Sequence, residues 1–265
     1  MREVESEHPA GTVGVPVGSG ARYVGFYADI DKLLVPKGTQ LLFAEGVNVA
    51  YNCNNLVLNM SGEWLWIMGD DHRFHSDLLL KLLDRKEDII VPVVCRRGMP
   101  FQTVLYKVAS TRLEEAAFLT YSWNELSQDY PQGGVAVVDA AGTAGMLVKK
   151  HIFTALGETP NWFEWNGKAS EDVGFCVKAR AKGYNICVDL DQRMTHTTAC
   201  ELTPYRDKNG KWDVAVQVTE RAVSLLNVPF EGKDLREVTY GRKGDGPGWE
   251  WTRPPVKSEQ SAGVP

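Results

Sequence analysis

The sequence lacks several features that would mark an exported or membrane-bound protein. No apolar run approaches the roughly 18 residues that a membrane-spanning helix needs. The first residues, Met1 to Glu7, have no apolar centre like that of a secretory signal peptide. The five cysteines are an odd number without a Cys-x-x-Cys pair, so neither a disulfide framework nor a structural zinc knot is indicated. We therefore expect a cytoplasmic chain that does not associate with a membrane.

An excess of positive charge is also missing. The chain carries 29 basic and 34 acidic side chains, a formal net charge of -5, so its bulk charge provides no attraction toward nucleic acid. A local basic face remains compatible with this balance. The side chains that could line one face are Arg96, Arg97, Lys149, Lys150, Arg180 and Lys182, although basic doublets most often lie on solvated surfaces.

The composition is that of a folded domain. In 265 residues, 43% are hydrophobic and 24% charged, which excludes wholesale disorder and fibrous classes. We expect one elaborated domain over residues 1–225, with parts at about 12–95 and 96–225. From residue 226 the composition shifts toward Gly, Pro, Lys and Glu, which predicts an extension and mobile tail over 226–265, where only Trp249 and Trp251 suggest docking.

Apolar runs of strand length alternate with helical segments. This alternation predicts an α/β fold with a mostly parallel sheet covered by helices on both faces, and ligands bound beyond the carboxyl ends of the strands. The predicted strands are 12–17, 40–45, 63–68, 88–94, 134–139 and 184–188, and the predicted helices are 23–34, 47–61, 78–84, 149–156 and 170–182. The hydrophobic residues in 96–133 do not recur with the period of a helix or a strand, and this segment is interpreted as a substrate-facing excursion.

Asp70, Asp71 and His72 directly follow an apolar strand. Two adjacent acids at a rigid strand end, together with one imidazole from a distant histidine, suit Mn²⁺ or Mg²⁺ bridging the phosphates of a nucleotide. A solvated turn that caps the next helix is the competing interpretation, and spacing alone favours neither. A joint role of His72 and His75 in chelation is a weak signal, so capping or surface roles are preferred for both.

Asp172 follows Ser170 and Glu171 at a predicted helix start. The pattern alone favours an ordinary N-cap with acids that complement the helix dipole. Its functional interpretation is a general base facing the crevice. His196 lies past a strand end, and a lone histidine there is more often incidental than a ligand.

Two further segments could face a ligand. Pro16, Val17 and Gly18 end the first strand, where a nucleotide could approach the backbone, but the glycine pattern lacks the later glycine and acid of a dinucleotide fingerprint. The segment 162–165, with two tryptophans and a glutamate, could stack on a sugar or base, or pack in the core.

Taken in order, these motifs resemble the GT-A glycosyltransferases of the family-2-like group over about residues 12–198. The likeness implies a GT-A, Rossmann-like fold with a C-terminal extension. It rests on Val13–Pro16, Trp64–His72, Gly142–Val148, Glu171–Cys176, Gly183–Tyr184 and Thr195–His196.

The resemblance implies roles for individual residues. Asp71 matches the metal-binding acid and His196 the late metal-binding histidine, while Asp172 matches the catalytic base. Gly69 departs from the usual first aspartate, which Asp70 could replace. The positions that match the nucleotide-holding region are Pro16, Val17, Glu45 and Asn52. Gly145 and Trp165 fall where such enzymes hold donor sugar and acceptor.

The implied activity is transfer of a sugar from a nucleotide-sugar, expected to be a UDP-sugar, to an acceptor hydroxyl with inversion. The chain resembles phage-encoded members, some of which decorate hydroxymethylated pyrimidines in viral DNA, and this suggests DNA as acceptor and the host cytoplasm as location. A saccharide or small-molecule acceptor is the first alternative. A nucleotidyltransferase and a nucleotide-binding module without turnover are the others.

Overall fold

A computed structural model of the chain describes residues 1–18, 23–46, 48–97, 101–108, 118–157, 160–165, 169–197, 201–218 and 221–224. The expected tail, with Trp249 and Trp251, lies outside these ranges. The helices are α1 (Val24–Lys32), α2 (Val49–Asn59), α3 (Leu78–Asp84), α4 (Trp123–Asp129), α5 (Lys150–Leu156) and α6 (Glu171–Ala181).

The central sheet has seven strands in the order β10-β13-β7-β12-β5-β2-β4. Their bounds are β2 (Thr12–Val17), β4 (Gln40–Glu45), β5 (Trp64–Ile67), β7 (Ile89–Val93), β10 (Val135–Val138), β12 (Met146–Lys149) and β13 (Ile186–Arg193). β4, β2, β5, β7 and β13 run in one direction, and β12 and β10 run in the other. The sheet is therefore mixed, and β12 and β10 depart from the expected parallel arrangement. The sequence does not reveal the direction of a strand, because an apolar strand that is buried on both faces has the same pattern in either direction.

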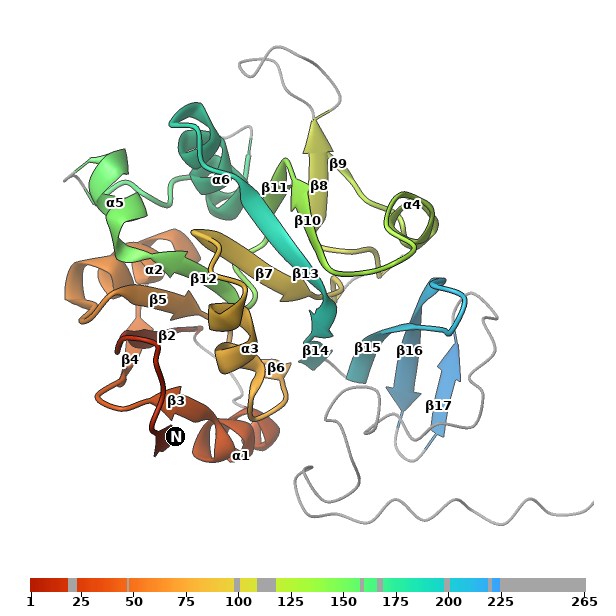
Figure 1. Ribbon diagram of the computed structural model, residues 1–265, viewed down its shortest axis with the longest axis horizontal. Coiled ribbons are helices and arrows are strands. Elements are labelled where there is room, and N and C mark those ends of the chain that lie inside the picture. The colour runs from red at the N-terminus through yellow and green to blue at the C-terminus, as the bar shows by residue number, and fades with distance from the viewer. Residues whose placement is uncertain are drawn as a thin grey trace, which may run out of the picture.

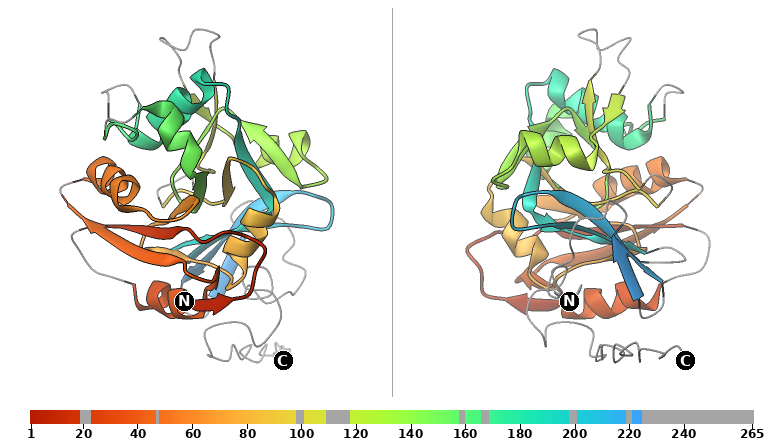
Figure 2. Two further views of the ribbon diagram at one scale, coloured as in Figure 1. Left: turned by 60° about the vertical axis from the view of Figure 1, so that its left-hand side comes forward. Right: turned by 90° about the vertical axis from the view of Figure 1, so that its right-hand side faces the viewer.

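Helices cover both faces of this sheet (Figures 1 and 2). In β5 alternate residues enter different cores: Trp64 and Trp66 pack with α1 and α3, whereas Leu65 and Ile67 pack with α2, α5 and α6. This split follows from the two-residue period of a strand. It explains why β5 is apolar throughout although its two faces meet different helices.

A second sheet of five strands lies beside the first, in the order β17-β16-β15-β14-β6 (Figure 1). Its strands are β6 (His72–Arg73), β14 (Thr195–Thr197), β15 (Glu201–Arg206), β16 (Trp212–Val218) and β17 (Arg221–Ser224). This sheet is not predictable from local sequence patterns. Its first two strands are too short to show a period, and they pair across more than a hundred residues.

Smaller strands complete the fold. β8 (Leu105–Val108), β9 (Phe118–Thr120) and β11 (Ala140–Ala141) form a three-stranded sheet, and β1 (Arg2–Val4) pairs with β3 (Leu34–Pro36). The excursion over 96–133 thus contains regular structure. Its helix α4 begins with a capping box, in which Ser122 and Glu125 satisfy each other's backbone N–H groups.

Candidate metal centre

Strand pairing brings three side chains together at the carboxyl end of β5. His72 opens β6 and lies opposite His196 in the antiparallel pair of β6 with β14. Their rings stack with centroids 4.4 Å apart and an interplanar angle of 25°. Asp71 precedes β6, and its carbonyl accepts a hydrogen bond of 2.7 Å from the Thr197 N–H. The backbone itself therefore fixes the positions of the three residues.

The carboxylate of Asp71 contacts both imidazoles. Its Oδ1 lies 2.9 Å from His72 Nδ1, and its Oδ2 lies 3.2 Å from His196 Nε2. Burial opposes ionisation of Asp71, but hydrogen bonds from His196 and His72 outweigh that effect and hold the pKa of this carboxyl well below its usual range. Asp71 is therefore an anion at neutral pH.

The imidazole of His196 is held from both sides. Its Nδ1 lies 2.8 Å from the Cys95 carbonyl oxygen, and its Nε2 faces Asp71. A neutral imidazole carries only one N–H. At one of these two contacts a lone pair of the ring nitrogen therefore faces a lone pair of the oxygen. Burial lowers the pKa of His196, which disfavours the doubly protonated ring. A metal ion at Nε2, with Nδ1–H donating to Cys95, satisfies every atom in the way that metal-binding histidines usually do.

Asp71, His72 and His196 can each offer one ligand atom, and these atoms lie within 4.8 Å of one another. The Nε2 of His72 is buried and has no hydrogen-bond partner among the described residues. The group could thus bind a divalent ion through one carboxylate and two imidazoles, a donor set suited to transition ions. The interpretation of His72 as a surface or capping residue is wrong, since its side chain is only 5% exposed.

The buried position of His72 cannot be predicted from the local sequence, because it depends on the pairing of β6 with β14. The departure at Gly69 also has a structural reason. A Cβ at position 69 would lie 2.7 Å from Asp71 Oδ1 and 3.1 Å from His72 Nδ1. An aspartate there would collide with the group. Asp70 is half-buried and is not part of the group.

The residues expected to hold a nucleotide lie at the carboxyl ends of β2 and β4, on the same edge of the sheet as the carboxyl end of β5. Val17 pairs with Glu45 at the ends of β2 and β4, and Pro16 lies opposite Ala44. Asn52 of α2 donates from Nδ2 to the Val17 carbonyl at 3.2 Å. Its Oδ1 is buried without a partner among the described residues, so one acceptor remains at this end of the sheet.

Asp172 lies in the first turn of α6. Its Oδ1 accepts hydrogen bonds from the Ser170 hydroxyl and, at 2.8 Å, from the Val173 N–H. Within the described ranges its Oδ2 has no hydrogen-bond partner, and it lies beside Gly142. One oxygen is thus fixed while the other can accept a proton. The expected side-chain cap from Ser170 is absent, because that hydroxyl bonds to Asp172.

A series of contacts leads from Asp172 to the metal centre. Gly142, beside Asp172, donates its N–H to the Val104 carbonyl at 2.8 Å. The segment around Val104 pairs with the segment at Cys95, whose carbonyl contacts His196. Asp172 and His196 are therefore linked through two intervening segments, those around Val104 and Cys95.

Gly145 and Trp165 occupy different environments. Gly145 is buried with φ +73°, and its carbonyl accepts a hydrogen bond of 2.8 Å from Trp66 Nε1. Trp165 is 69% exposed, whereas Trp162 and Phe163 of the same loop are buried. The loop is held by Asn54, which bonds both backbone groups of Phe163. Core packing therefore holds for Trp162 and Phe163, whereas Trp165 lies outside the core.

The expected basic residues do not form one continuous face. Arg97 approaches Asp71, with 3.1 Å between Nη1 and Oδ2. Lys149 pairs with Trp64 at the start of β5, the opposite end of the strand from Asp71, and its ammonium bonds to Asp88. Arg180 is paired with Asp139.

The chain is similar in fold to a solved structure, A197 from STIV. The TM-score is 0.50 at 10% sequence identity, and the match covers 80% of this chain and 96% of that chain. At this identity the likeness shows a shared fold alone. No protein-family model matches the sequence, and no curated protein matches it. Within the described ranges, no helix is both long and apolar enough to cross a bilayer.

Proposed function

We propose that this chain is a metal-dependent GT-A glycosyltransferase that moves a sugar from a nucleotide-sugar to an acceptor hydroxyl. The observation that carries the proposal is the convergence of Asp71, His72 and His196 at the carboxyl end of β5. This edge adjoins the ends of β2 and β4, where a nucleotide would bind, as in other open α/β sheets. The similar fold of A197 agrees with this architecture.

The donor set would hold Mn²⁺ in preference to Mg²⁺, because two imidazoles suit a transition ion better than a cation that prefers oxygen ligands. When bound, such an ion supplies positive charge that stabilises a departing diphosphate. The buried Oδ1 of Asn52 would accept from an N–H of the nucleotide base, with Pro16, Val17 and Glu45 beside it. We propose a UDP-sugar as donor, since the uracil ring carries such an N–H.

Asp172 would act as general base. Its Oδ2 takes the proton of the acceptor hydroxyl as that oxygen bonds to the anomeric carbon, and the bond from this carbon to the diphosphate oxygen breaks. A single displacement of this kind inverts the configuration. The hydrogen bonds from Ser170 and Val173 to Oδ1 orient the carboxylate and leave Oδ2 free to react.

The acceptor we propose is a hydroxymethylated pyrimidine in phage DNA, with the exposed Trp165 available to stack on a base. The test is transfer of radiolabelled hexose from UDP-sugars to hydroxymethylated DNA, with unmodified DNA and simple saccharides as controls. Transfer to saccharides alone would assign a different acceptor. Pyrophosphate release would indicate a nucleotidyltransferase instead.

The matched variants are Asp172→Asn and Glu171→Gln, which remove neighbouring acids from the same helical turn. We expect Asp172→Asn to abolish transfer while UDP binding in the presence of Mn²⁺ stays intact, and Glu171→Gln to keep turnover. Unchanged turnover in Asp172→Asn would remove this residue from the chemistry. Metal-dependent UDP binding by the wild type without transfer or donor hydrolysis would indicate a nucleotide-binding module.

A further inference from the structure

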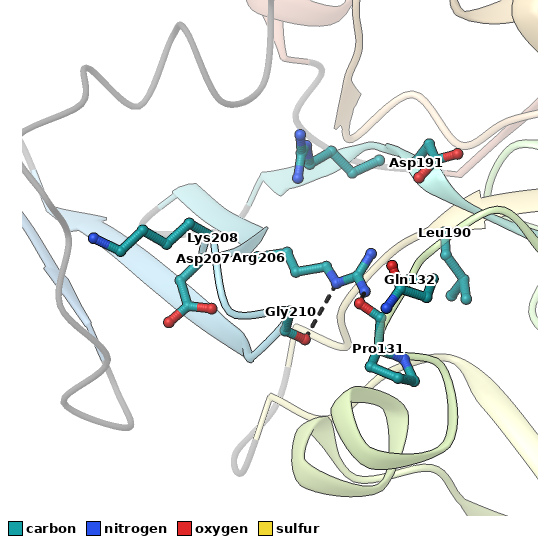
Figure 3. A pocket seen from close by; sticks show the side chains of 9 residues that line it. Pro131, Gln132, Leu190, Asp191, Arg206, Asp207, Lys208 and Gly210 are labelled. Carbon is teal, nitrogen blue, oxygen red and sulfur yellow. Dashed lines mark hydrogen bonds between the residues drawn. The ribbon is translucent and has the colours of Figure 1, made fainter.

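A pocket of about 380 Å³ opens where the β15–β16 hairpin meets β13 and the turn after α4 (Figure 3). Three basic and two acidic side chains line it, so the local charge is positive in a chain whose net charge is -5. The metal centre and the proposed nucleotide site use none of these residues. A polar, positively charged hollow of this kind needs its own explanation.

A β-bulge shapes one wall of the pocket. In the pairing of β13 with β7, Asp189 lies opposite Pro92 and Arg193 lies opposite Val93, so residues 190–192 are extra. The bulge is held by hydrogen bonds between Leu190 N–H and the Gly134 carbonyl, and between Gly134 N–H and Asp191. Bulges commonly redirect side chains next to functional sites. Here the bulge places Arg193 at the pocket.

The guanidinium of Arg193 has no carboxylate within ion-pair distance among the described residues. Asp191, the acid that most favours its charge, is paired with Arg85 at 2.8 Å. Burial lowers the pKa of Arg193, and the nearby charge of Arg206 lowers it further. Arg193 is thus a largely buried cation whose charge is not fully balanced by the protein.

Arg206 enters the same pocket from the hairpin. Figure 3 shows its side chain reaching toward Pro131 and Gln132, with a hydrogen bond to the Gly210 carbonyl. Nε and Nη2 donate to backbone carbonyls, which carry no net charge. Nη1 makes no hydrogen bond to any described residue. The acid beside it in the hairpin, Asp207, accepts the N–H groups of its own turn.

We propose that this pocket binds a phosphate group, whose oxygens accept hydrogen bonds from Arg193 and from Nη1 of Arg206. Guanidinium groups suit phosphate because their forked donors match its oxygens. A phosphate has enough oxygens to accept from two guanidiniums on different strands. The proposal is independent of the glycosyltransferase assignment, and its phosphate could belong to a small molecule or to a DNA backbone.

The test uses the full chain in EDTA, so that the metal centre cannot contribute. Inorganic phosphate binding is measured by calorimetry, and binding of a short fluorescein-labelled oligodeoxynucleotide by anisotropy over a salt series. The variants are Arg193→Gln, Arg193→Lys and the control Arg2→Gln. Arg2 carries the same charge on an exposed strand well separated from the hairpin in Figure 1. Unfolding midpoints verify that each variant is folded.

We expect Arg193→Gln to weaken binding by about tenfold to a hundredfold, Arg193→Lys to weaken it less, and Arg2→Gln to have little effect. Dependence on Arg193 with inorganic phosphate alone would identify a small phosphate ligand. Dependence with the oligonucleotide, where the slope of log affinity against log salt falls by about 1, would identify a DNA phosphate. If neither probe binds, or if Arg193→Gln and Arg2→Gln behave alike with both, the proposal is overturned.

Discussion

Strand β6 carries two buried polar residues side by side, and they are satisfied in different ways. Arg73 bonds Asp29 through Nε at 2.6 Å and Nη2 at 3.2 Å, and both side chains are 5% exposed. Every contact in that pair joins an N–H to a carboxylate oxygen. In the neighbouring His72 group one buried nitrogen has no partner in the part of the chain that the structure describes, and lone pairs face each other at His196.

The difference separates a structural ion pair from a candidate binding site. The carboxylate of Asp29 accepts hydrogen bonds from the buried Arg73 and, at 3.3 Å, from the Phe74 N–H. The carboxylate of Asp71 contacts two imidazoles and the partly exposed Arg97, and the neutral ring of His196 cannot donate at both of its contacts. Both carboxylates are largely buried, and the matching of donors to acceptors distinguishes them.

The largest expected effect comes from breaking the structural pair. Asp29→Ala removes the carboxylate that pairs with the buried guanidinium of Arg73, which should reduce the free energy of unfolding by about 3–5 kcal/mol. Urea denaturation measures this loss. The double variant Asp29→Leu with Arg73→Met should recover most of it, because no charge is then left buried. A loss below about 1 kcal/mol in Asp29→Ala would contradict the comparison.

The metal centre should show the opposite behaviour, gaining stability from a ligand. Saturation with Mn²⁺ at about a hundred times its dissociation constant should raise the free energy of unfolding by about 2.7 kcal/mol. Asp71→Asn should lose this gain, since the only anionic ligand of the group is removed. Thermal unfolding with Mn²⁺ and with EDTA measures both. Equal stabilisation of wild type and variant would place the ion elsewhere.

The contribution of the third ligand can be measured separately. His72→Phe keeps a ring stacked on His196 but removes both nitrogens, and we expect Mn²⁺ affinity to fall by about tenfold to a hundredfold. Calorimetric titration gives the affinity. His151→Phe is the matched control, because this histidine is 54% exposed and outside the group. Unchanged affinity in His72→Phe would reduce the site to two protein ligands.

The smallest expected effect on the free energy of unfolding comes from a partly exposed carboxylate, Glu125. Hydrogen bonds from Lys107 and from Ser122 lower the pKa of Glu125 to about 2. Its folded pKa lies below its unfolded value, so the stability it adds is present above about pH 4.5 and is lost as the pH falls toward 2. Glu125 is 38% exposed, so the effect should stay below about 1 kcal/mol. Urea denaturation should show that the difference in free energy of unfolding between wild type and Glu125→Gln is smaller at pH 3 than at pH 7.

The parts of the fold that are predictable from the sequence are those with strong local patterns. The strands β2, β4, β5 and β7 are apolar runs bounded by turn residues, and α3 matches its expected bounds, Leu78–Asp84. The end of α6 is signalled by Gly183, which adopts φ +89°. Strand direction at β12 is not predictable, because it depends on which neighbours the strand meets.

The candidate site is only partly predictable for the same reason. Asp71 and His196 come from a family resemblance, and no local pattern links residues so far apart. His72 becomes a candidate ligand through the register of two short strands, and Arg193 through a bulge that has no sequence signature. The segment 96–133 does contain one readable signal, the capping box at Ser122, since Ser-x-x-Glu is a recognised helix start.

The pairing of β6 with β14 has a consequence for how the protein is made. His196 and Asp71 are 125 residues apart in the chain. During synthesis the ribosome must pass residue 196 before the second imidazole can dock, and contacts of such long range form late in folding. A chain that ends earlier lacks His196 and so lacks one of the three candidate ligands. Ion binding at this group would therefore report that β6 and β14 have paired.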